Sequence, residues 1–222
     1  MNKNIENMLD FFVSEFKNVE IRKNFEKLKH RTNAKQINKM WIDLRINENQ
    51  KLYELLIKEY GNNFQIRTVT CNKKIVKEHV PIATYIKKSD FFKNYEESRF
   101  YQKVFKQTNI FFFFEKKGNE SFLVDYLILN TSEKKILKDF ITVWTDTERK
   151  FLDKEIIVKK DEKQKFLINF TKPGDQLSFH VRPKAVNSND VYKSFEGPKI
   201  PKQTLWINKE ILQQQLENKK ND

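Results

Sequence analysis

The sequence predicts a mixed α/β fold in which a central mixed β-sheet is flanked by helices. Three observations indicate this class. Apolar residues recur at helical spacing near the N-terminus, the pattern then changes to a strand-like alternation, and two apolar runs, the first rich in phenylalanine, follow near the middle of the chain. With 222 residues, 20 of them phenylalanine, the chain is long enough to bury a sizeable core.

The N-terminal part is predicted to be helical. Apolar residues such as Ile5, Leu9 and Phe12 predict one or two amphipathic helices over residues 4–29. A further helix is expected over residues 49–60, and Gly61 ends it in a C-cap position. We therefore expect a helical part, residues 1–60, followed by a core, residues 61–222.

The first half of the core is predicted to supply most of the sheet. Residues 64–69 alternate between apolar and polar side chains, and residues 80–86 form a second candidate strand. The runs 110–114 and 122–129 flank a polar turn at 117–119 and predict a hairpin. This hairpin is too apolar to lie at an exposed edge of a sheet.

The second half of the core predicts helices and strands in mixed order. Ser132 is a candidate N-cap for a helix that reaches Trp144, and Thr147 is a candidate N-cap for another that reaches Glu155. Residues 166–170 and 177–181 are expected to be strands, and residues 207–217 a closing helix.

Composition favours a polyanionic partner and excludes several kinds of site. Lys and Arg number 43 against 30 Asp and Glu, a net charge of +13, which is typical of proteins that bind nucleic acid. The single cysteine, Cys71, excludes an internal disulfide and a cysteine-based metal cluster. His30, His79 and His180 lack metal-ligand spacing. The sequence has no apolar run of membrane-spanning length and no signal peptide, so we expect a cytoplasmic protein without a membrane partner.

The most informative motif is Arg182-Pro183-Lys184, which follows an apolar run at residues 179–181. An arginine can donate two hydrogen bonds to a guanine edge, and a lysine adds a charge directed at phosphate. Proline fixes the backbone between them. The motif predicts a loop that reads bases in the major groove of DNA. An ordinary surface turn in a basic protein is the alternative.

Four further residues are candidate DNA contacts. Gln203 is expected at an adenine edge, Tyr192 at the DNA backbone or a thymine methyl group, and Lys202 and Lys103 at phosphates. For Lys103 the structural alternative is that its methylene stem covers the phenylalanine-rich strand. Residues 187–190 are polar enough to form a loop that becomes ordered on DNA.

Four segments, taken in order, resemble one protein family. Residues 95–104 resemble a Trp-Glu-x-Ser…Lys-Leu segment, residues 137–144 a helix that follows it, residues 182–185 an Arg-Pro-Lys-Ala segment, and residues 202–208 a Lys…Phe-Trp-Leu-Asn segment. These segments belong to the MutH mismatch-repair endonuclease and its Sau-type relatives, the type II restriction enzymes that cut at GATC. The resemblance implies the restriction-endonuclease fold and binding of duplex DNA.

The same resemblance locates a degenerate catalytic site. Family members use an Asp followed by Glu-x-Lys, and the two carboxylates hold Mg²⁺. Here Lys58 stands near the Asp position, Gln65 at the Glu and Arg67 at the Lys. An amide oxygen is a weaker ligand for Mg²⁺ than a carboxylate, and two cations repel the metal. Alternatively, Glu78 or Asp90 serves as the acid.

Three functions remain open at this point. The first is a non-cleaving, GATC-binding regulatory copy of a type II restriction endonuclease. It has no cofactor of its own; Mg²⁺ belongs to a catalytic nuclease domain in the same or another chain, and residues 1–60 are its candidate connection. The second is a complete Mg²⁺-dependent endonuclease that uses an atypical set of carboxylates, for which Asp43, Glu59, Glu78 and Asp90 are candidates. The third is a basic interaction module without sequence preference.

Overall fold

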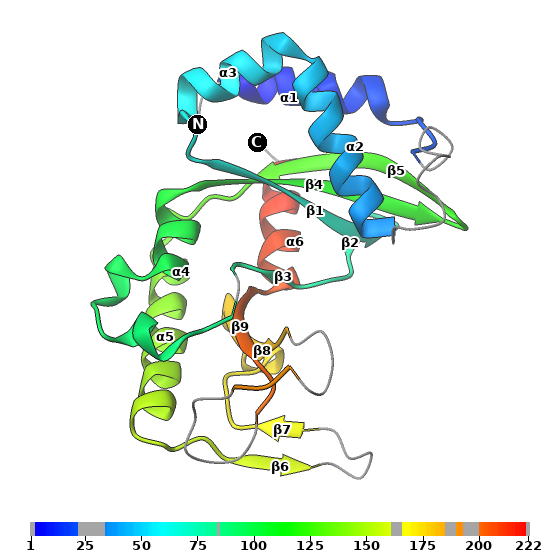
Figure 1. The fold of residues 1–222 in the computed structure, drawn as a ribbon. Helices are drawn as coiled ribbons and strands as arrows, with labels where there is room; N and C mark the ends of the chain where they lie inside the picture. The colour runs from blue at the N-terminus through cyan, green and yellow to red at the C-terminus, as the bar shows by residue number, and fades with distance from the viewer. Residues whose placement is uncertain are drawn as a thin grey trace. The chain divides into compact units, whose positions relative to one another are not determined.

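The computed structural model of the protein describes residues 3–21, 34–83, 85–160, 166–184, 190–192 and 200–220. The chain forms two compact units, each assembled from separate stretches. Unit 1 comprises Met1–Glu78, Gln107–Asn130 and Leu212–Asp222, and unit 2 comprises His79–Lys106 and Thr131–Ile211. The expected α/β class is confirmed, with a mixed sheet flanked by helices (Figure 1). The division of the chain at residue 60 stays a prediction.

Unit 1 is built on a four-stranded sheet in the order β2-β1-β4-β5. Its strands are β1 (Phe64–Asn72), β2 (Ile75–Val76), β4 (Thr108–Lys117) and β5 (Glu120–Ile128). β1 and β4 are parallel, with Gln65 beside Asn109, whereas β4 and β5 form the expected antiparallel hairpin. Parallel neighbours need a long crossover connection. Here the connection between β1 and β4 includes residues 79–106 of unit 2.

Helices cover both faces of this sheet (Figure 1). They are α1 (Lys3–Phe16), α2 (Ala34–Glu48), α3 (Gln50–Tyr60) and α6 (Lys209–Asn218), of which the part from Leu212 onward lies in unit 1. Apolar residues of α1, α2 and α3 share one buried core with Ile110, Phe112 and Phe114, alternate residues of β4. On α6, Gln213 accepts a hydrogen bond from the backbone of Val76 at 2.8 Å.

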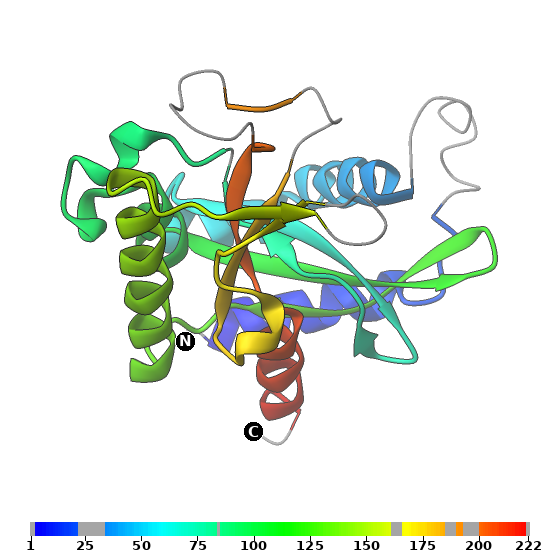
Figure 2. The ribbon, with the colours of Figure 1, turned by 90° about the horizontal axis from the view of Figure 1, so that it is seen from below.

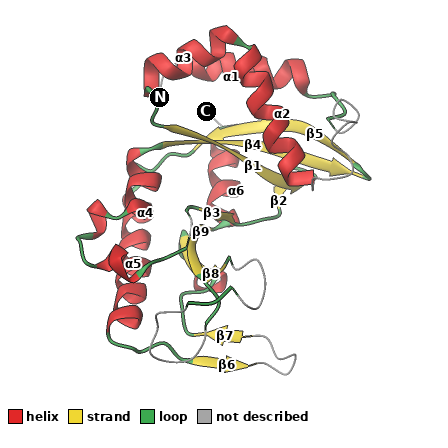
Figure 3. Cartoon of the chain, viewed as in Figure 1, coloured by secondary structure: helices red, strands yellow, loops and turns green. Residues whose placement is uncertain are grey.

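The strands of unit 2 are shorter than β1, β4 and β5 of unit 1 (Figure 3). It contains a three-stranded antiparallel sheet in the order β3-β9-β8 and a separate pair, β6-β7. The elements are β3 (Val80–Pro81), α4 (Arg99–Tyr101) with a π-helical turn at Gln102–Lys106, α5 (Lys134–Leu152), β6 (Val158–Lys160), β7 (Phe166–Ile168), β8 (Phe179–Pro183) and β9 (Gln203–Ile207). The ring of Phe140 on α5 packs between Trp144, Tyr101, Phe105 and Phe179.

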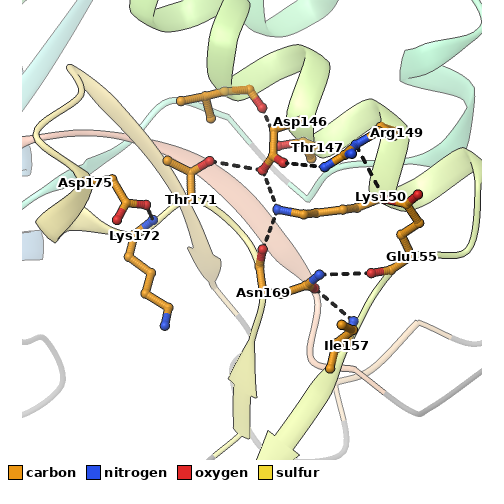
Figure 4. Close-up of polar contacts among 11 residues, drawn as sticks. Asp146, Thr147, Arg149, Lys150, Glu155, Ile157, Asn169, Thr171, Lys172 and Asp175 are labelled. Carbon is orange, nitrogen blue, oxygen red and sulfur yellow. Dashed lines mark hydrogen bonds and ion pairs between the residues drawn. The ribbon is translucent and has the colours of Figure 1, made fainter.

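A polar network ties the C-terminal end of α5 to the strand pair β6-β7 (Figure 4). The carboxylate of Asp146 accepts hydrogen bonds from Lys150 at 2.6 Å and from Thr171 at 3.2 Å. The Lys150 ammonium also donates to the backbone carbonyl of Asn169. The Asn169 side chain in turn accepts from the backbone of Ile157 at 2.9 Å. Lys150 is 9% exposed, so its charge is neutralised by these contacts rather than by water.

Several sequence expectations are wrong in detail. One helix, α5, replaces the two that were expected to begin at Ser132 and Thr147. Thr147 lies inside this helix and donates its hydroxyl hydrogen to the backbone of Val143 at 2.6 Å, so it does not need to act as a cap. The strand expected over residues 80–86 is only Val80–Pro81. Helix α2 and strands β6 and β9 were not predicted. Residues 22–29 of the first helical region lie outside the described residues.

The turn between β1 and β2 holds its backbone in a strained conformation. Asn72 pairs with Ile75, so the loop contains two residues, Lys73 and Lys74, with φ of 48° and 64°. Such a left-handed two-residue hairpin turn favours Asn-Gly, and each side chain with a Cβ costs about 1–2 kcal/mol there. Gly118, with φ of 58°, opens the β4-β5 turn without this cost.

No helix among the described residues is both long and apolar enough to cross a membrane.

Candidate nucleic-acid interface

Strand β8 lies at the edge of its sheet, beside β9 (Figure 2). Its last two residues, Arg182 and Pro183, are exposed at the surface of unit 2. The three preceding residues, Phe179, His180 and Val181, are buried. An edge strand tolerates proline because one row of its N–H groups is not needed for the ladder. The Arg-Pro pair expected in a loop therefore lies at the end of a strand, where pairing with β9 fixes its backbone. Ala185 and residues 187–189 lie outside the described residues.

The exposed guanidinium of Arg182 lies over the ring of Trp206, 4.6 Å from its centroid. The indole N–H of Trp206 donates to the backbone carbonyl of Arg182 at 3.3 Å. A stacked guanidinium keeps its N–H donors in the plane of the group, where they remain available to a ligand. Trp206 therefore positions Arg182 before any ligand binds. The sequence analysis placed Trp206 in a family segment and did not identify this role.

Lys184 and Lys202 lie beside this strand end but already have partners. The ammonium of Lys184 donates to the backbone carbonyl of Ala83 at 2.9 Å. The ammonium of Lys202 pairs with Asp190 at 2.6 Å and lies over the ring of Tyr85 at 4.7 Å. The hydrogen bond to Asp190 raises the pKa of Lys202. A phosphate contact by Lys202 thus competes with an existing ion pair.

Tyr192 and Gln203 belong to the framework beneath the surface. The Tyr192 hydroxyl donates to the carbonyl of Ile86 at 2.9 Å and accepts from the backbone of Gln203 at 3.0 Å, and burial raises its pKa. The Gln203 side chain is fully buried and donates to the carbonyl of Pro201 at 2.6 Å. In this arrangement neither side chain presents the DNA contact that the sequence suggested.

Lys103, the remaining candidate for a phosphate contact, lies in the π-helical turn of unit 2, and its side chain is half-buried.

A buried carboxylate fixes the start of β8. Asp139 on α5 accepts hydrogen bonds from the backbone N–H of Ser178 at 2.8 Å and from its hydroxyl at 2.6 Å. Lys135 adds an ion pair at 2.5 Å. Burial raises the pKa of Asp139, but the hydrogen bonds from Lys135 and Ser178 outweigh it, and the pKa lies below its ordinary value. Asp139 therefore holds the strand that carries Arg182.

Two histidines contact each other near Trp206, and one of them, His180, stacks beside its ring. His180 is fully buried, stacks beside Trp206, and meets His79 edge to face at 4.7 Å. Its Nδ1 faces the side-chain oxygen of Asn208, so this nitrogen carries the proton and donates it. Its Nε2 is buried and finds no partner among the described residues. Burial, together with the charges of His79 and Arg182, lowers the pKa of His180 to about 4.

We expect His180 to make the protein less stable in mild acid. The unfolded chain takes up this proton near pH 6.5, whereas the folded chain does so only near pH 4. The contribution of His180 to the free energy of unfolding is therefore complete above about pH 7 and is lost as the pH falls from about 6.5 to about 4. Chemical denaturation across this range measures the effect. His180→Gln keeps a donor for Asn208 without the titration, so its profile should be flatter. A histidine resonance of folded wild type that titrates near 6.5 and belongs to His180 contradicts the prediction.

The positions that the resemblance assigns to a degenerate catalytic site, Lys58, Gln65 and Arg67, lie in unit 1. Gln65 and Arg67 share one face of β1, next to Asn109 of β4. The Arg67 guanidinium donates to the Gln65 side-chain oxygen at 2.7 Å and to the Asn109 side-chain oxygen at 2.9 Å. Burial lowers the pKa of Arg67 to about 10, so it stays charged at neutral pH. Lys58, on α3, is exposed.

This arrangement does not fit Mg²⁺. Two amide oxygens offer no negative charge, and a fixed cation already occupies their hydrogen-bonding sites. The alternative acids have other partners: Glu78 accepts from the backbone of Thr70, Asp90 pairs with Arg99, and Asp43 pairs with Lys39. Glu59 is exposed on α3. In the part of the chain that the structure describes, no three His, Cys, Asp or Glu side chains come together as a metal site.

Comparison with models of protein families yields no match for this chain, and comparison with curated proteins yields none.

Proposed function

We propose that this chain binds duplex DNA at 5'-GATC-3' without cutting it. It acts as the regulatory C-terminal copy of a type II restriction endonuclease related to MutH and the Sau-type enzymes, and it has the restriction-endonuclease fold. Its partners are GATC-containing duplex DNA and a catalytic nuclease domain, in the same or another chain, that carries the Mg²⁺. DNA binding by this copy changes the activity of the catalytic domain only through a contact that differs between two conformational states.

One observation carries the DNA-binding part of the proposal: the exposed Arg182 guanidinium held on the Trp206 ring at the end of β8. A fork of donors in a fixed plane suits the O6 and N7 acceptors of guanine. His180, which stacks beside Trp206, is fully buried, so the ring under the arginine has a rigid support. Rigid support reduces the entropy lost when the side chain binds a base.

The absence of cleavage is supported by Arg67. Its guanidinium donates to the side-chain oxygens of Asn109 and of Gln65, the residue at which the resemblance expects a catalytic Glu. A metal at this place has to displace a buried cation and obtains only neutral ligands in return. We therefore expect this chain not to require Mg²⁺ for DNA binding.

The test compares matched duplexes that contain GATC or a scrambled site, each with Mg²⁺ and with a chelator. We expect tighter binding to GATC in both conditions, since specific and non-specific binding differ by about 10³–10⁷-fold in proteins of this kind. Plasmid incubated with the protein in Mg²⁺ or Mn²⁺ should remain supercoiled. Nicking that is lost in Glu59→Ala or Glu78→Ala establishes the complete endonuclease instead. Equal binding to both duplexes, weakened by salt, establishes the non-specific module.

A further inference from the structure

Two pairs of lysines lie at the same end of the unit 1 sheet. Lys73 and Lys74 form the β1-β2 turn, and Lys116 and Lys117 end β4. Because β1 and β4 are parallel, their C-terminal ends meet at one edge (Figure 1). The backbone N–H of Lys73 donates to Glu115 at 2.8 Å, which joins the two turns. With Lys77, which follows β2, these residues make up what we call the basic edge.

The backbone of the β1-β2 turn indicates that its lysines are not there for folding. Both residues have positive φ, a conformation that is strained for any residue other than glycine. The turn geometry itself favours Asn-Gly. Both lysine side chains are exposed and fill no part of the core. Strained residues with no packing role are a feature of functional sites.

The charges of the basic edge are largely uncompensated. All five lysines are exposed, and no ion pair is found among the described residues for Lys73, Lys74, Lys77 or Lys116. Lys117 pairs with Glu115 at 3.3 Å, and the same carboxylate accepts the Lys73 N–H. Like charges gathered in this way repel one another unless a polyanion lies against them.

We propose that the basic edge binds the phosphate backbone of duplex DNA without regard to sequence, as a second contact separate from the Arg182 strand. The proposal uses the proposed function only in taking DNA as the partner. Duplex DNA presents a dense row of negative charges, which suits lysines on two neighbouring turns. An anionic membrane is a less suitable partner, because binding to a membrane surface needs a sizeable apolar face. Among the described residues of these turns, Ile75 is the large hydrophobic side chain that is exposed, and one side chain is not such a face.

The double variant Lys73→Asn/Lys74→Gly separates folding from binding. Asn-Gly relieves the strained turn, so Tm should rise, while two charges are lost. Affinity for GATC and for scrambled duplexes should fall by the same factor. The slope of log affinity against log salt should become shallower by about 1.8 if each lysine contacts one phosphate. Between about 50 and 200 mM salt, the variant should then lose about twelvefold less affinity than wild type.

The matched control is Lys3→Gln/Lys51→Gln, which removes two charges from exposed positions on α1 and α3 of the same unit. It should leave the salt slope close to that of wild type. The proposal fails if the turn variant has a higher Tm but the same salt slope as wild type. It also fails if the control variant makes the salt slope shallower by the same amount, because the effect is then one of net charge. It also fails if the turn variant binds vesicles that contain phosphatidylserine more weakly than wild type does but keeps the wild-type affinity for DNA. An Arg182→Ala variant with a reduced GATC preference but the wild-type slope separates this surface from the proposed recognition site.

Discussion

Arg182→Ala should lower affinity for GATC duplexes about ten- to hundredfold and leave scrambled-site binding nearly unchanged. A bidentate contact from arginine to guanine contributes about 1–3 kcal/mol of discrimination, whereas scrambled-site binding depends on phosphates. Stability should change little, because Arg182 is exposed and its contact with Trp206 is worth about 0.5–1 kcal/mol at such a site. Titration of labelled duplexes by fluorescence anisotropy measures both affinities.

Arg182→Lys is the matched control for this experiment. It keeps the positive charge and the contact with the Trp206 ring but loses the planar fork of donors. We expect it to behave like Arg182→Ala on GATC and like wild type on scrambled DNA. If Arg182→Ala weakens both duplexes equally, Arg182 is a phosphate contact and the recognition proposal fails. If the variant unfolds, Arg182 is a structural residue.

Asp139→Ala should lower the free energy of unfolding by about 3 kcal/mol. The substitution leaves the backbone N–H and hydroxyl of Ser178 buried without their acceptor and removes the partner of Lys135. Losing one partner of a buried charged hydrogen bond costs more than the pair itself contributes. Chemical denaturation at neutral pH measures the change. A loss below about 1 kcal/mol indicates that water replaces the carboxylate and contradicts the prediction.

Two variants separate the charge of Asp139 from its geometry. Asp139→Asn keeps one acceptor oxygen, so it should be intermediate at neutral pH. Because the folded-state pKa of Asp139 lies below its ordinary value of 3.8, its charge stabilises the protein above that pH. The difference between wild type and Asp139→Asn should therefore disappear as the pH falls below about 4. Ser178→Ala removes only one of the two donors, and its effect should be smaller than that of Asp139→Ala.

Sequence patterns were most reliable where burial repeats with a regular period. The β4-β5 hairpin follows from two apolar runs around a turn with glycine, and α3 follows from the helical stretch expected at residues 49–60 and the Gly61 that ends it. Helix α2 was missed because exposed apolar residues, Met40 and Leu44, lie among its buried ones and blur the period. The strand expected at 80–86 is regular only at Val80–Pro81, although Ile82 and Ile86 still donate backbone hydrogen bonds to β9 at 2.9 and 2.8 Å.

Local motifs identified the candidate site only in part. Arg182 was recognised from its own segment, since an arginine beside proline at a strand end is visible in the sequence. Its support by Trp206 depends on the pairing of β8 with β9, which places His180 opposite Trp206. The contact of Asp139 with Ser178 joins residues 39 positions apart and has no local signal. Gln203 was assigned to an adenine edge because a glutamine side chain can form two hydrogen bonds with adenine, yet here it is buried.

The interleaving of the two units along the chain has a consequence for synthesis on the ribosome. Strand β1 cannot pair with β4 until the whole of His79–Lys106 has been translated. The α6 residues that cover the sheet, from Leu212 onward, are translated after every residue of unit 2. Unit 2 can therefore complete its fold first, while one apolar face of the β4-β5 hairpin remains exposed to solvent. Newly made chains should accordingly depend on chaperones until α6 emerges, since exposed strands of this kind aggregate readily.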